Sequence, residues 1–466
     1  MGAPGERQAP AWLRAVNILL VNPPLYDYAA LDLWAKPLGL LQIGAALRAL
    51  GVNVAVLDYL DVQQYGPADA KAGIAPPVLK KHGTAQYMKR KAAAPPLTPL
   101  PRAWYYRYGL SHARAQELLA AVPPPELILI TSQFTYVYPG VQDAIAFLRR
   151  RYPGTPVWLG GIYAQTCAAH AGAHSGADRV VTSTDIAEIV AQVARQLECR
   201  RAIPAAWHTF AGLPSPALDL YPALRYLPVR TSRGCVNACN YCVAHQLYPQ
   251  FEERPWQQVV DEIESAGARF SVKDVAFYDD ALLVNASRRI VPLLRHAAAQ
   301  RWPLRFHVPN AMHIHLMTQE IADAMRAAQV TTIRLGLETI NATRVRATGA
   351  KYAAADVARC MQALRAAGFA REMIGMYILV GLPGQTVEEV RATIRCVREE
   401  FGVQAKLAEY SPIPGTALWP AAVGESRVPI TDEPLWHNNS LLAYRSPVFT
   451  PDVLAALRAA TRTCSG

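Results

Sequence analysis

The sequence predicts an α/β protein with a doubly wound parallel sheet, then a partial (β/α)6 barrel and a short C-terminal cap. Two observations predict this fold class. Short runs rich in Val, Ile and Leu alternate with helical patterns through most of the 466 residues, as is typical of parallel sheets buried on both faces. A Pro-rich loop then separates two such βα arrays, which indicates two domains rather than one.

Length and spacing together predict the domain boundaries, since about 150 residues is a common domain size. We expect a first domain over residues 1–200 with an insertion at 62–125, a linker at 201–226, a second domain at 227–420 and a cap at 421–466.

Five apolar runs are the expected strands of the first domain: 17–24, 52–59, 127–134, 156–163 and 178–184. A helix is expected from about Leu38 to Leu50, where Gly51 is a natural stop. Another begins at Asp185, with Glu188 three residues on. Ligands of such sheets bind beyond the carboxyl ends of the strands, here at 22–24, Asp58, 132–136 and 160–163.

The insertion interrupts the βα rhythm and is expected to contain no strands. It holds a basic cluster (Lys80-Lys81 and 89–91), the Pro-rich stretch 94–101 and the aromatic run 104–108. Long insertions are often functional, but a surface excursion that packs its aromatic side chains on the core is the simpler interpretation.

The second domain has six expected strands, at 227–231, 274–278, 305–308, 331–337, 373–380 and 405–410. Helical patterns lie between them at 256–266, 287–300, 319–328, 353–367 and 387–401. Six strand–helix units in a row predict an incomplete barrel, with its chemistry at the carboxyl ends of the strands.

Composition excludes several classes. With 52% hydrophobic and 18% charged residues, the chain is neither disordered nor a coiled coil. No apolar run approaches about 18 residues, so no membrane span is expected, and the N-terminal region has no secretory h-region. The net charge of +11 favours a solvated basic surface over a polyanion site, because no nucleic-acid-binding motif accompanies it.

Three of the eight cysteines lie close together, at Cys235, Cys239 and Cys242, directly after the first strand of the second domain. Clustered thiols in a reducing compartment indicate a metal site. Structural zinc needs four ligands, and only His245 lies nearby, at an odd spacing. A four-iron cluster held by three cysteines instead leaves one iron open, which is a catalytic arrangement.

This C-x3-C-x2-C spacing, with Tyr241 before the third cysteine, resembles the signature loop of radical S-adenosylmethionine (SAM) enzymes, and the resemblance covers about residues 227–419. It implies a [4Fe–4S] cluster on the three cysteines. It also implies SAM on the fourth iron, cleaved reductively to methionine and a 5′-deoxyadenosyl radical.

Further residues match by resemblance. Asp279 and Asp280 end the second strand, where the family contacts the SAM amino group, although the family's usual Gly-Gly-Glu is absent. Glu338 matches the position that approaches the SAM ribose or methionyl end. Gly381 and Gly384, in Gly-Leu-Pro-Gly after the fifth strand, match the backbone that lines the adenine.

The first domain resembles that of the cobalamin-binding subgroup of radical SAM enzymes, through residues 22–24, 36–44 and 159–161. Many members of that subgroup are methyltransferases. The Asp-x-His-x-x-Gly segment with its axial histidine is absent, and His170 and His174 are the nearby candidates or else helix-surface residues. Whether cobalamin binds stays open at this point.

The favoured function is therefore C–H functionalisation of an unknown substrate, with cobalamin-dependent methyl transfer as the favoured subtype. One alternative is a non-methylating radical reaction (cyclisation, C–C bond formation or rearrangement), in which the first domain binds substrate. Another is a non-catalytic iron–sulfur or zinc protein. The resemblance also implies a flavodoxin- or ferredoxin-type electron donor and a cytoplasmic location, and no nucleic-acid partner is expected. The segments 104–108, 134–138 and 436–439 are candidates for an aromatic substrate pocket.

Overall fold

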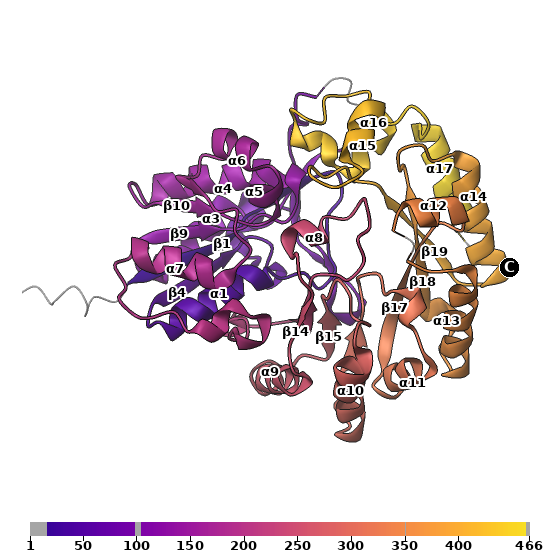
Figure 1. Ribbon diagram of the computed structural model, residues 1–466. Helices are drawn as coiled ribbons and strands as arrows, with labels where there is room; N and C mark the ends of the chain where they lie inside the picture. Colours follow the sequence, from indigo (N-terminus) through magenta and orange to yellow (C-terminus); the bar gives the residue numbers. More distant parts are fainter. Residues whose placement is uncertain (1–15, 98–103, 350, 463–466) are drawn as a thin grey trace, which may run out of the picture.

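The computed structural model describes residues 16–97, 104–349 and 351–462. Cys464 and residues 98–101 of the Pro-rich stretch lie outside these ranges. Figure 1 shows the first domain on one side, the barrel strands and their helices on the other, and the C-terminal helices above the junction. The predicted fold class is confirmed.

The first domain is a doubly wound parallel sheet. Its strand order is β11-β10-β9-β1-β4, with bounds β1 Asn17–Asn22, β4 Asn53–Asp58, β9 Leu127–Ile130, β10 Val157–Leu159 and β11 Arg179–Val180. Successive side chains of a strand point to opposite faces. Leu19 and Val21 therefore pack with α4 (Tyr138–Arg151), whereas Ile18 and Leu20 pack with α1 (Leu38–Ala49) and α7 (Ile186–Gln196).

The helix ends of this domain follow the expected capping chemistry. Gly51 has φ 78°, a conformation that glycine adopts without strain. Asp185 caps α7 by accepting hydrogen bonds from the amides of Ala187 and Glu188.

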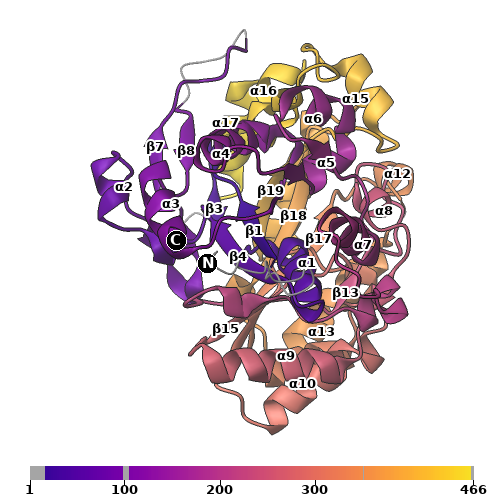
Figure 2. The ribbon, with the colours of Figure 1, turned by 90° about the vertical axis from the view of Figure 1, so that its left-hand side faces the viewer.

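The insertion contains strands, so the expectation that it has none is wrong. Its elements are α2 (Pro67–Lys71), β5 (Val78–Leu79), β6 (Ala85–Gln86), β7 (Lys89–Lys91), β8 (Tyr106–Tyr108) and α3 (His112–Leu118). They pair with β2 (Leu25–Asp27) and β3 (Leu31–Asp32) into two small sheets, β2-β8-β7 and β3-β6-β5. Figure 2 shows α2, α3, β7 and β8 beside the main sheet. Strands this short leave no periodic pattern, and their partners are distant in sequence.

The second domain is the predicted partial barrel. Six parallel strands follow the order β12-β15-β16-β17-β18-β19. Their bounds are β12 Leu227–Val229, β15 Asp274–Phe277, β16 Arg305–His307, β17 Val330–Glu338, β18 Ile374–Val380 and β19 Gln404–Glu409. The outer face packs on five helices: α9 Trp256–Arg269, α10 Ile290–Ala299, α11 Gln319–Ala327, α13 Ala354–Ala366 and α14 Val387–Arg395.

The C-terminal cap joins both domains. It holds α15 (Trp419–Glu425), α16 (Leu442–Arg445) and α17 (Pro451–Ala460). Asn438 donates to the Asp27 carboxylate at 2.8 Å and His437 lies 2.9 Å from the Thr135 hydroxyl, both in the first domain. On the barrel side, the buried Arg445 guanidinium donates to the Tyr410 carbonyl at 2.6 Å.

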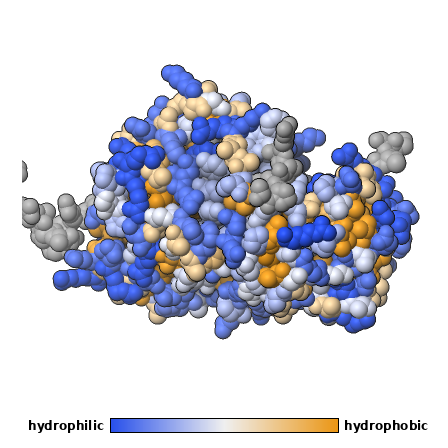
Figure 3. Space-filling view, turned by 90° about the horizontal axis from the view of Figure 1, so that it is seen from above, coloured by the Kyte–Doolittle hydropathy of each residue, from blue (hydrophilic) through white to orange (hydrophobic). Residues whose placement is uncertain are grey.

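The surface seen from above in Figure 3 is mostly hydrophilic, with hydrophobic residues in separate patches. Among the described residues, no helix is both long and apolar enough to cross a bilayer.

Candidate functional site

The three clustered cysteines lie on the loop that follows β12, at the carboxyl end of the barrel. Cys235 and Cys239 are buried and Cys242 is exposed. Two glycines shape the loop. A Cβ on Gly234, which has φ 77°, would lie 2.5 Å from the Gln250 carbonyl oxygen, and one on Gly349 would lie 3.2 Å from the Cys239 Cα. The loop is therefore held tightly from both sides.

Hydrogen-bond donors surround the sulfur atoms. The Asn237 amide lies 3.4 Å from the Cys235 Sγ, and the Ala244 amide lies 3.5 Å from the Cys242 Sγ. The His313 Nε2 lies 3.7 Å from the Cys235 Sγ. Burial raises the pKa of the Cys239 thiol to about 11. A bound metal is what makes such thiols give up their protons.

The sulfur spacing argues against a single zinc ion. Zn–S bonds of about 2.3 Å in a tetrahedral site place the sulfur atoms about 3.8 Å apart, but the three Sγ atoms here are not all within 4.8 Å of one another. The fourth candidate ligand, His245, has its Nε2 2.8 Å from the Asn237 carbonyl oxygen. Three clustered thiols without a fourth ligand fit a cluster with one open iron better than a closed zinc site.

Asp279 is directed into the protein beneath this loop. Its carboxylate accepts hydrogen bonds from the hydroxyls of Thr231 and Ser232, both at 2.6 Å, and from Arg289 at 3.0 Å. Asp279 and Arg289 are both almost fully buried. The carboxylate thus braces the start of the cysteine loop: Oδ1 accepts all three of these bonds, and the Thr231 amide lies 3.2 Å from both oxygens.

Asp280 is the more available of the two predicted carboxylates. One oxygen accepts a hydrogen bond from the Gly234 amide at 3.2 Å. Burial raises the pKa of Asp280, and the Arg230 guanidinium opposes that rise. Asp279 and Asp280 lie just after β15, which ends at Phe277, and they have different surroundings despite being adjacent.

Glu338 ends β17 in a strained conformation. Its φ is 56°, in the left-handed region, and the pairing register shifts between Gly336 and Glu338. The Tyr352 hydroxyl holds the bulge by donating to the carbonyls of Leu337 and Thr339. Strain of this kind in a non-glycine residue is typical of functional sites.

Lys351 is paired with Glu338, with 3.0 Å between Nζ and Oε1. Its ammonium also lies 5.3 Å from the centre of the Tyr241 ring. Nearby carboxylate and thiolate charges raise the pKa of Lys351 although burial, the largest influence, opposes them. The site therefore has a buried cation beside the three thiols.

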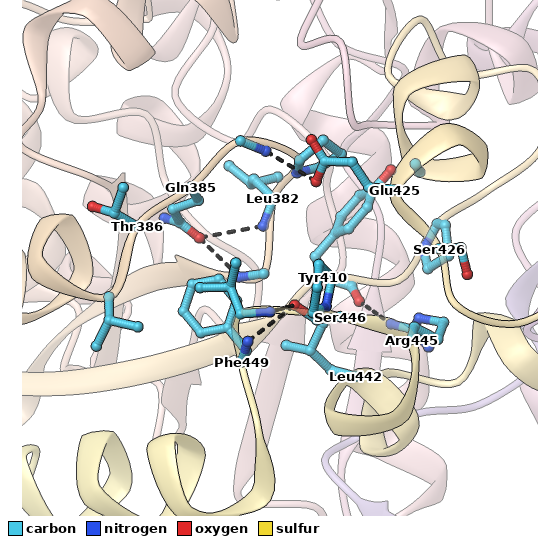
Figure 4. A pocket seen from close by; sticks show the side chains of 18 of the residues that line it. Leu382, Gln385, Thr386, Tyr410, Glu425, Ser426, Leu442, Arg445, Ser446 and Phe449 are labelled. Atoms are coloured by element: carbon cyan, nitrogen blue, oxygen red, sulfur yellow. Dashed lines mark hydrogen bonds between the residues drawn. The ribbon is translucent and has the colours of Figure 1, made fainter. Parts of the chain in front are cut away.

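Gly381 and Gly384 lie on the loop between β18 and α14. They line a cavity of about 390 Å³ between this loop and the cap, shown in Figure 4. The Gln385 side chain accepts a hydrogen bond from the Gly381 amide at 2.8 Å, and Glu425 accepts one from the Gly384 amide at 3.1 Å. Leu382, between the two glycines, belongs to the same hydrophobic cluster as Tyr241, which brings this loop to the cysteine side of the barrel.

A second cavity, of about 290 Å³, lies at the carboxyl end of the first sheet. The first domain contributes apolar side chains and parts of the strand-end segments 132–136 and 160–163, and the barrel contributes polar residues. The lining includes Leu129, Ser132, Trp158, Gly160, Gly161 and Ile186 from the first domain and Arg230, Arg233, Tyr248 and Asp280 from the second. Asp280 therefore connects this cavity to the cysteine loop.

Neither predicted axial histidine lines this cavity. The His170 Nδ1 lies 2.6 Å from the Tyr163 hydroxyl, and burial lowers the pKa of His170 to about 4. His174 is exposed.

The three candidate segments for an aromatic pocket do converge, but mainly as a packed contact. Tyr105 packs on Tyr28 with 5.1 Å between ring centres. The Tyr138 hydroxyl donates to Glu433 at 3.0 Å. The cap is thereby fixed to the first domain.

The residues of the site that were not predicted include Arg230, Arg233, Tyr248, His313 and Lys351. None belongs to a local motif, and each reaches the site through the fold. Lys351 comes from the segment between α12 (Ala342–Ala347) and α13, and His313 from the loop after β16.

Comparison with known proteins places these sites in context. Residues 229–397 match the family model described as the radical SAM superfamily. An uncharacterised methyltransferase of Pyrococcus horikoshii is 25% identical over 222 residues, which cover 46% of this chain and 47% of the relative. A tRNA-2-methylthio-N(6)-dimethylallyladenosine synthase of Mycobacterium tuberculosis is 27% identical over 236 residues, 47% of this chain and 41% of the relative. The chain thus spans about half the length of the curated relatives it matches or less.

Two solved structures share the fold over nearly the whole chain. The radical SAM methyltransferase TsrM from Kitasatospora setae, with cobalamin and a [4Fe–4S] cluster bound, has a TM-score of 0.66 at 18% identity, covering 97% of this chain and 92% of that one. The cobalamin-dependent radical enzyme OxsB has a TM-score of 0.55 at 12% identity, covering 88% of this chain and 55% of that one.

Proposed function

We propose that the protein is a cobalamin-dependent radical SAM methyltransferase, because residues 229–397 match the radical SAM superfamily model and the chain shares its fold with a radical SAM methyltransferase that binds cobalamin. The substrate is an organic molecule with an unactivated carbon to be methylated. The alternative is a non-methylating radical reaction, with substrate rather than cobalamin in the first domain's cavity.

Cys235, Cys239 and Cys242 would hold the [4Fe–4S] cluster. When bound, the cluster supplies the electron that cleaves SAM, and cobalamin supplies a methyl carrier. Asp280 and Glu338 would accept hydrogen bonds from the amine or hydroxyl groups of SAM, for which carboxylates are suited. Asp279, whose Oδ1 accepts bonds from Thr231, Ser232 and Arg289, would position the cysteine loop.

The observation that carries the proposal is the shared cavity. Its apolar part lies at the carboxyl end of the first sheet, where doubly wound domains bind ligands. Its polar part is formed by Arg230, Arg233 and Asp280 of the barrel. A cofactor bound in this cavity would therefore lie against Asp280, which also accepts a hydrogen bond from Gly234 in the cysteine loop.

The cavity is suited to the apolar portion of a large cofactor. Leu129, Trp158 and Ile186 form its walls. A Cβ on Gly161 would lie 2.3 Å from the Ser132 carbonyl oxygen, so only glycine keeps these two turns together. No histidine lines the cavity, so apolar side chains and the main chain of these two turns would hold cobalamin there.

Two glycines make this testable. Gly160 lines the cavity and a Cβ on it would meet no atom within 4 Å, so Gly160→Leu fills the cavity without a backbone clash. Gly172 is equally open but lies outside the cavity on α6 (Ala168–His174), so Gly172→Leu is the matched control.

We expect hydroxocobalamin to bind the wild type and the Gly172→Leu variant, and the Gly160→Leu variant to bind it at least tenfold more weakly by absorbance titration. Iron content should be the same in all three proteins. Equal binding by both variants would contradict the placement of cobalamin, and absence of binding in all three proteins would favour the non-methylating alternative.

A one-electron reductant is required by the domain. We propose a flavodoxin or ferredoxin for this role and the cytoplasm as the location. The support is the net positive charge of the chain, which suits an acidic donor; reduction rates that are independent of salt would argue against it.

A further inference from the structure

We propose that a third cavity, between the barrel and the insertion, binds an organic anion with an apolar body. The cavity measures about 660 Å³. Thr332, Arg334 and Tyr377 line it from the barrel, and Trp34, Lys81 and His82 line it from the first domain. No cysteine and none of the proposed cofactor residues lines it, so the proposal does not rest on the proposed function.

The charge of this cavity is positive and unbalanced. Its lining includes Arg334, Lys80 and Lys81 and contains no carboxylate. Among the residues that the structure describes, none of these three cations forms an ion pair. Asp274, which lies 3.8 Å from the ring of the lining residue His82, is engaged by Arg305 at 2.8 Å and by His307 at 2.8 Å.

Arg334 is the centre of the site. Its guanidinium lies over Gly375 of β18, where a Cβ would come within 3.1 Å of Nη1. Burial lowers the pKa of Arg334, and only the Tyr377 phenol opposes this. The pKa of Lys406, on β19, is also lowered. Burial is the larger cause, and the positive charge of Arg334 is the smaller one.

Several other buried cations of the chain are paired with carboxylates, although the buried Arg445 is held by main-chain carbonyls instead. Lys36, Arg289 and Arg254, which are also largely buried, each have a carboxylate within 3.2 Å. Half-buried cations without a counter-ion are costly. An anionic ligand would supply the missing charge, and Arg334 would bind carboxylate or phosphate oxygens in a forked geometry.

The backbone of the opposite wall is strained. Trp34 has φ 66° and His82 has φ 58°, both in the left-handed region that side chains other than glycine rarely adopt. The Trp34 indole nitrogen donates to the His82 carbonyl at 2.6 Å and its ring stacks on His307. Backbone strain at two contacting residues is typical of a functional site.

The rim of the cavity is apolar. Leu33 and Leu79 line it while 48% and 57% exposed, and Leu31 and Val78 on the same small sheet are also exposed. An exposed group of this kind marks a binding surface. Together with Trp34 and Tyr377, it fits a ligand whose charged head lies at Arg334 and whose apolar body reaches the rim.

The ligand would join the insertion to the barrel, because Lys81 and Arg334 approach the cavity from different domains. Arg334 lies four residues before Glu338 on β17, or about 13 Å along the strand. Tyr377 pairs with Gly336, which lies between Arg334 and Glu338 on β17, and its hydroxyl donates to the Pro309 carbonyl at 3.2 Å.

The test uses isothermal titration of the full chain with three probes of one shape: 2-naphthoate, 2-naphthyl phosphate and uncharged 2-naphthol. We expect at least one anion to bind with a stoichiometry of one and the naphthol to bind at least tenfold more weakly. Binding of naphthoate alone would identify a carboxylate ligand, binding of the phosphate alone a phosphate ester, and binding of both a site that recognises charge. Naphthol binding as tightly as the anions, or no anion binding, would overturn the proposal.

Two variants locate the binding. Arg334→Gln should weaken the anion at least tenfold, whereas Arg391→Gln, at an exposed position on α14, should have no effect. Leu79→Asn, which changes a side chain that is 57% exposed, should weaken whichever naphthyl anion binds several-fold. Wild-type affinity in both Arg334→Gln and Leu79→Asn would show that the anion binds elsewhere.

Discussion

The Lys351 ammonium lies 3.0 Å from the Glu338 carboxylate, beside the three-cysteine loop. Both side chains are mostly buried, at 16% and 13% exposure. The pair joins the strained end of β17 to a loop that also contributes Gly349, which packs against Cys239. One ion pair thus holds together the proposed SAM contact and the proposed cluster ligands.

Breaking this pair leaves a buried charge without a partner. We expect Glu338→Gln and Lys351→Gln each to lower the free energy of unfolding of the metal-free chain by about 3 kcal/mol. The double variant should lose less than the sum, with a coupling of about 1–3 kcal/mol. Urea denaturation of the four proteins measures this cycle, and strictly additive losses would show that the two residues do not interact.

The adjacent residues Asp279 and Asp280 should have different roles, Asp279 in stability and Asp280 in SAM binding. Asp279→Asn leaves Arg289 buried without its partner, so we expect a loss of about 3–5 kcal/mol of stability. Asp280→Asn should change stability little and weaken SAM binding to the reconstituted protein at least tenfold. Denaturation measures the stability of both variants, and equilibrium dialysis with labelled SAM measures their SAM binding. A large loss of stability in Asp280→Asn, with weaker SAM binding in a stable Asp279→Asn, would contradict the prediction.

Cys239, a proposed cluster ligand, and Cys360, a core residue, should respond differently to replacement by alanine. Cys239→Ala should reduce reconstituted iron from about four per chain to near zero. Cys360→Ala, on α13 and fully buried in the barrel core, should keep the iron and lose about 1–2 kcal/mol of stability. Equal iron loss in both variants, by colorimetric assay, would mean that the ligands are misassigned.

The cap should respond to pH through His437. Burial lowers the pKa of His437 to about 4, below the value of about 6.5 in an unfolded chain. The unfolded state therefore takes up a proton first as pH falls, so the stability from the neutral ring is fully present above pH 6.5 and is lost between about 6.5 and 4, to a total of about 3 kcal/mol.

Comparison with His437→Gln isolates this effect, because the other histidines titrate alike in both proteins. The wild type should be the more stable at pH 7, and its advantage should shrink as pH falls to 4.5. Denaturation at pH 7, 5.5 and 4.5 measures the difference; an advantage that is constant with pH would rule out a neutral buried ring.

Much of the fold could be predicted from the sequence because its βα units are long and regular. The predicted strand at 274–278 is β15, and the predicted 373–380 is β18 within one residue. The short strands β5 to β8 could not be predicted, since two or three residues give no period. Their pairing with β2 and β3 depends on the fold.

The site could be predicted where spacing along the chain decides it, as for Cys235, Cys239 and Cys242. The roles of Asp279 and Asp280 could not, because Arg289, ten residues later, determines which one is buried in an ion pair. At the start of α14, the Thr386 hydroxyl accepts a hydrogen bond from the Glu389 amide, while the Glu389 carboxylate pairs with Arg344, a partner that only the fold brings near.

The central claim is tested most directly by a product assay on anaerobically reconstituted protein with SAM, cobalamin and a strong reductant. S-adenosylhomocysteine and 5′-deoxyadenosine are quantified together by mass spectrometry in the wild type, Cys239→Ala and Gly160→Leu. The account predicts that the wild type forms S-adenosylhomocysteine only when cobalamin is present, and that both variants lose this product. S-adenosylhomocysteine formation that is independent of cobalamin, or unchanged in Gly160→Leu, would contradict it.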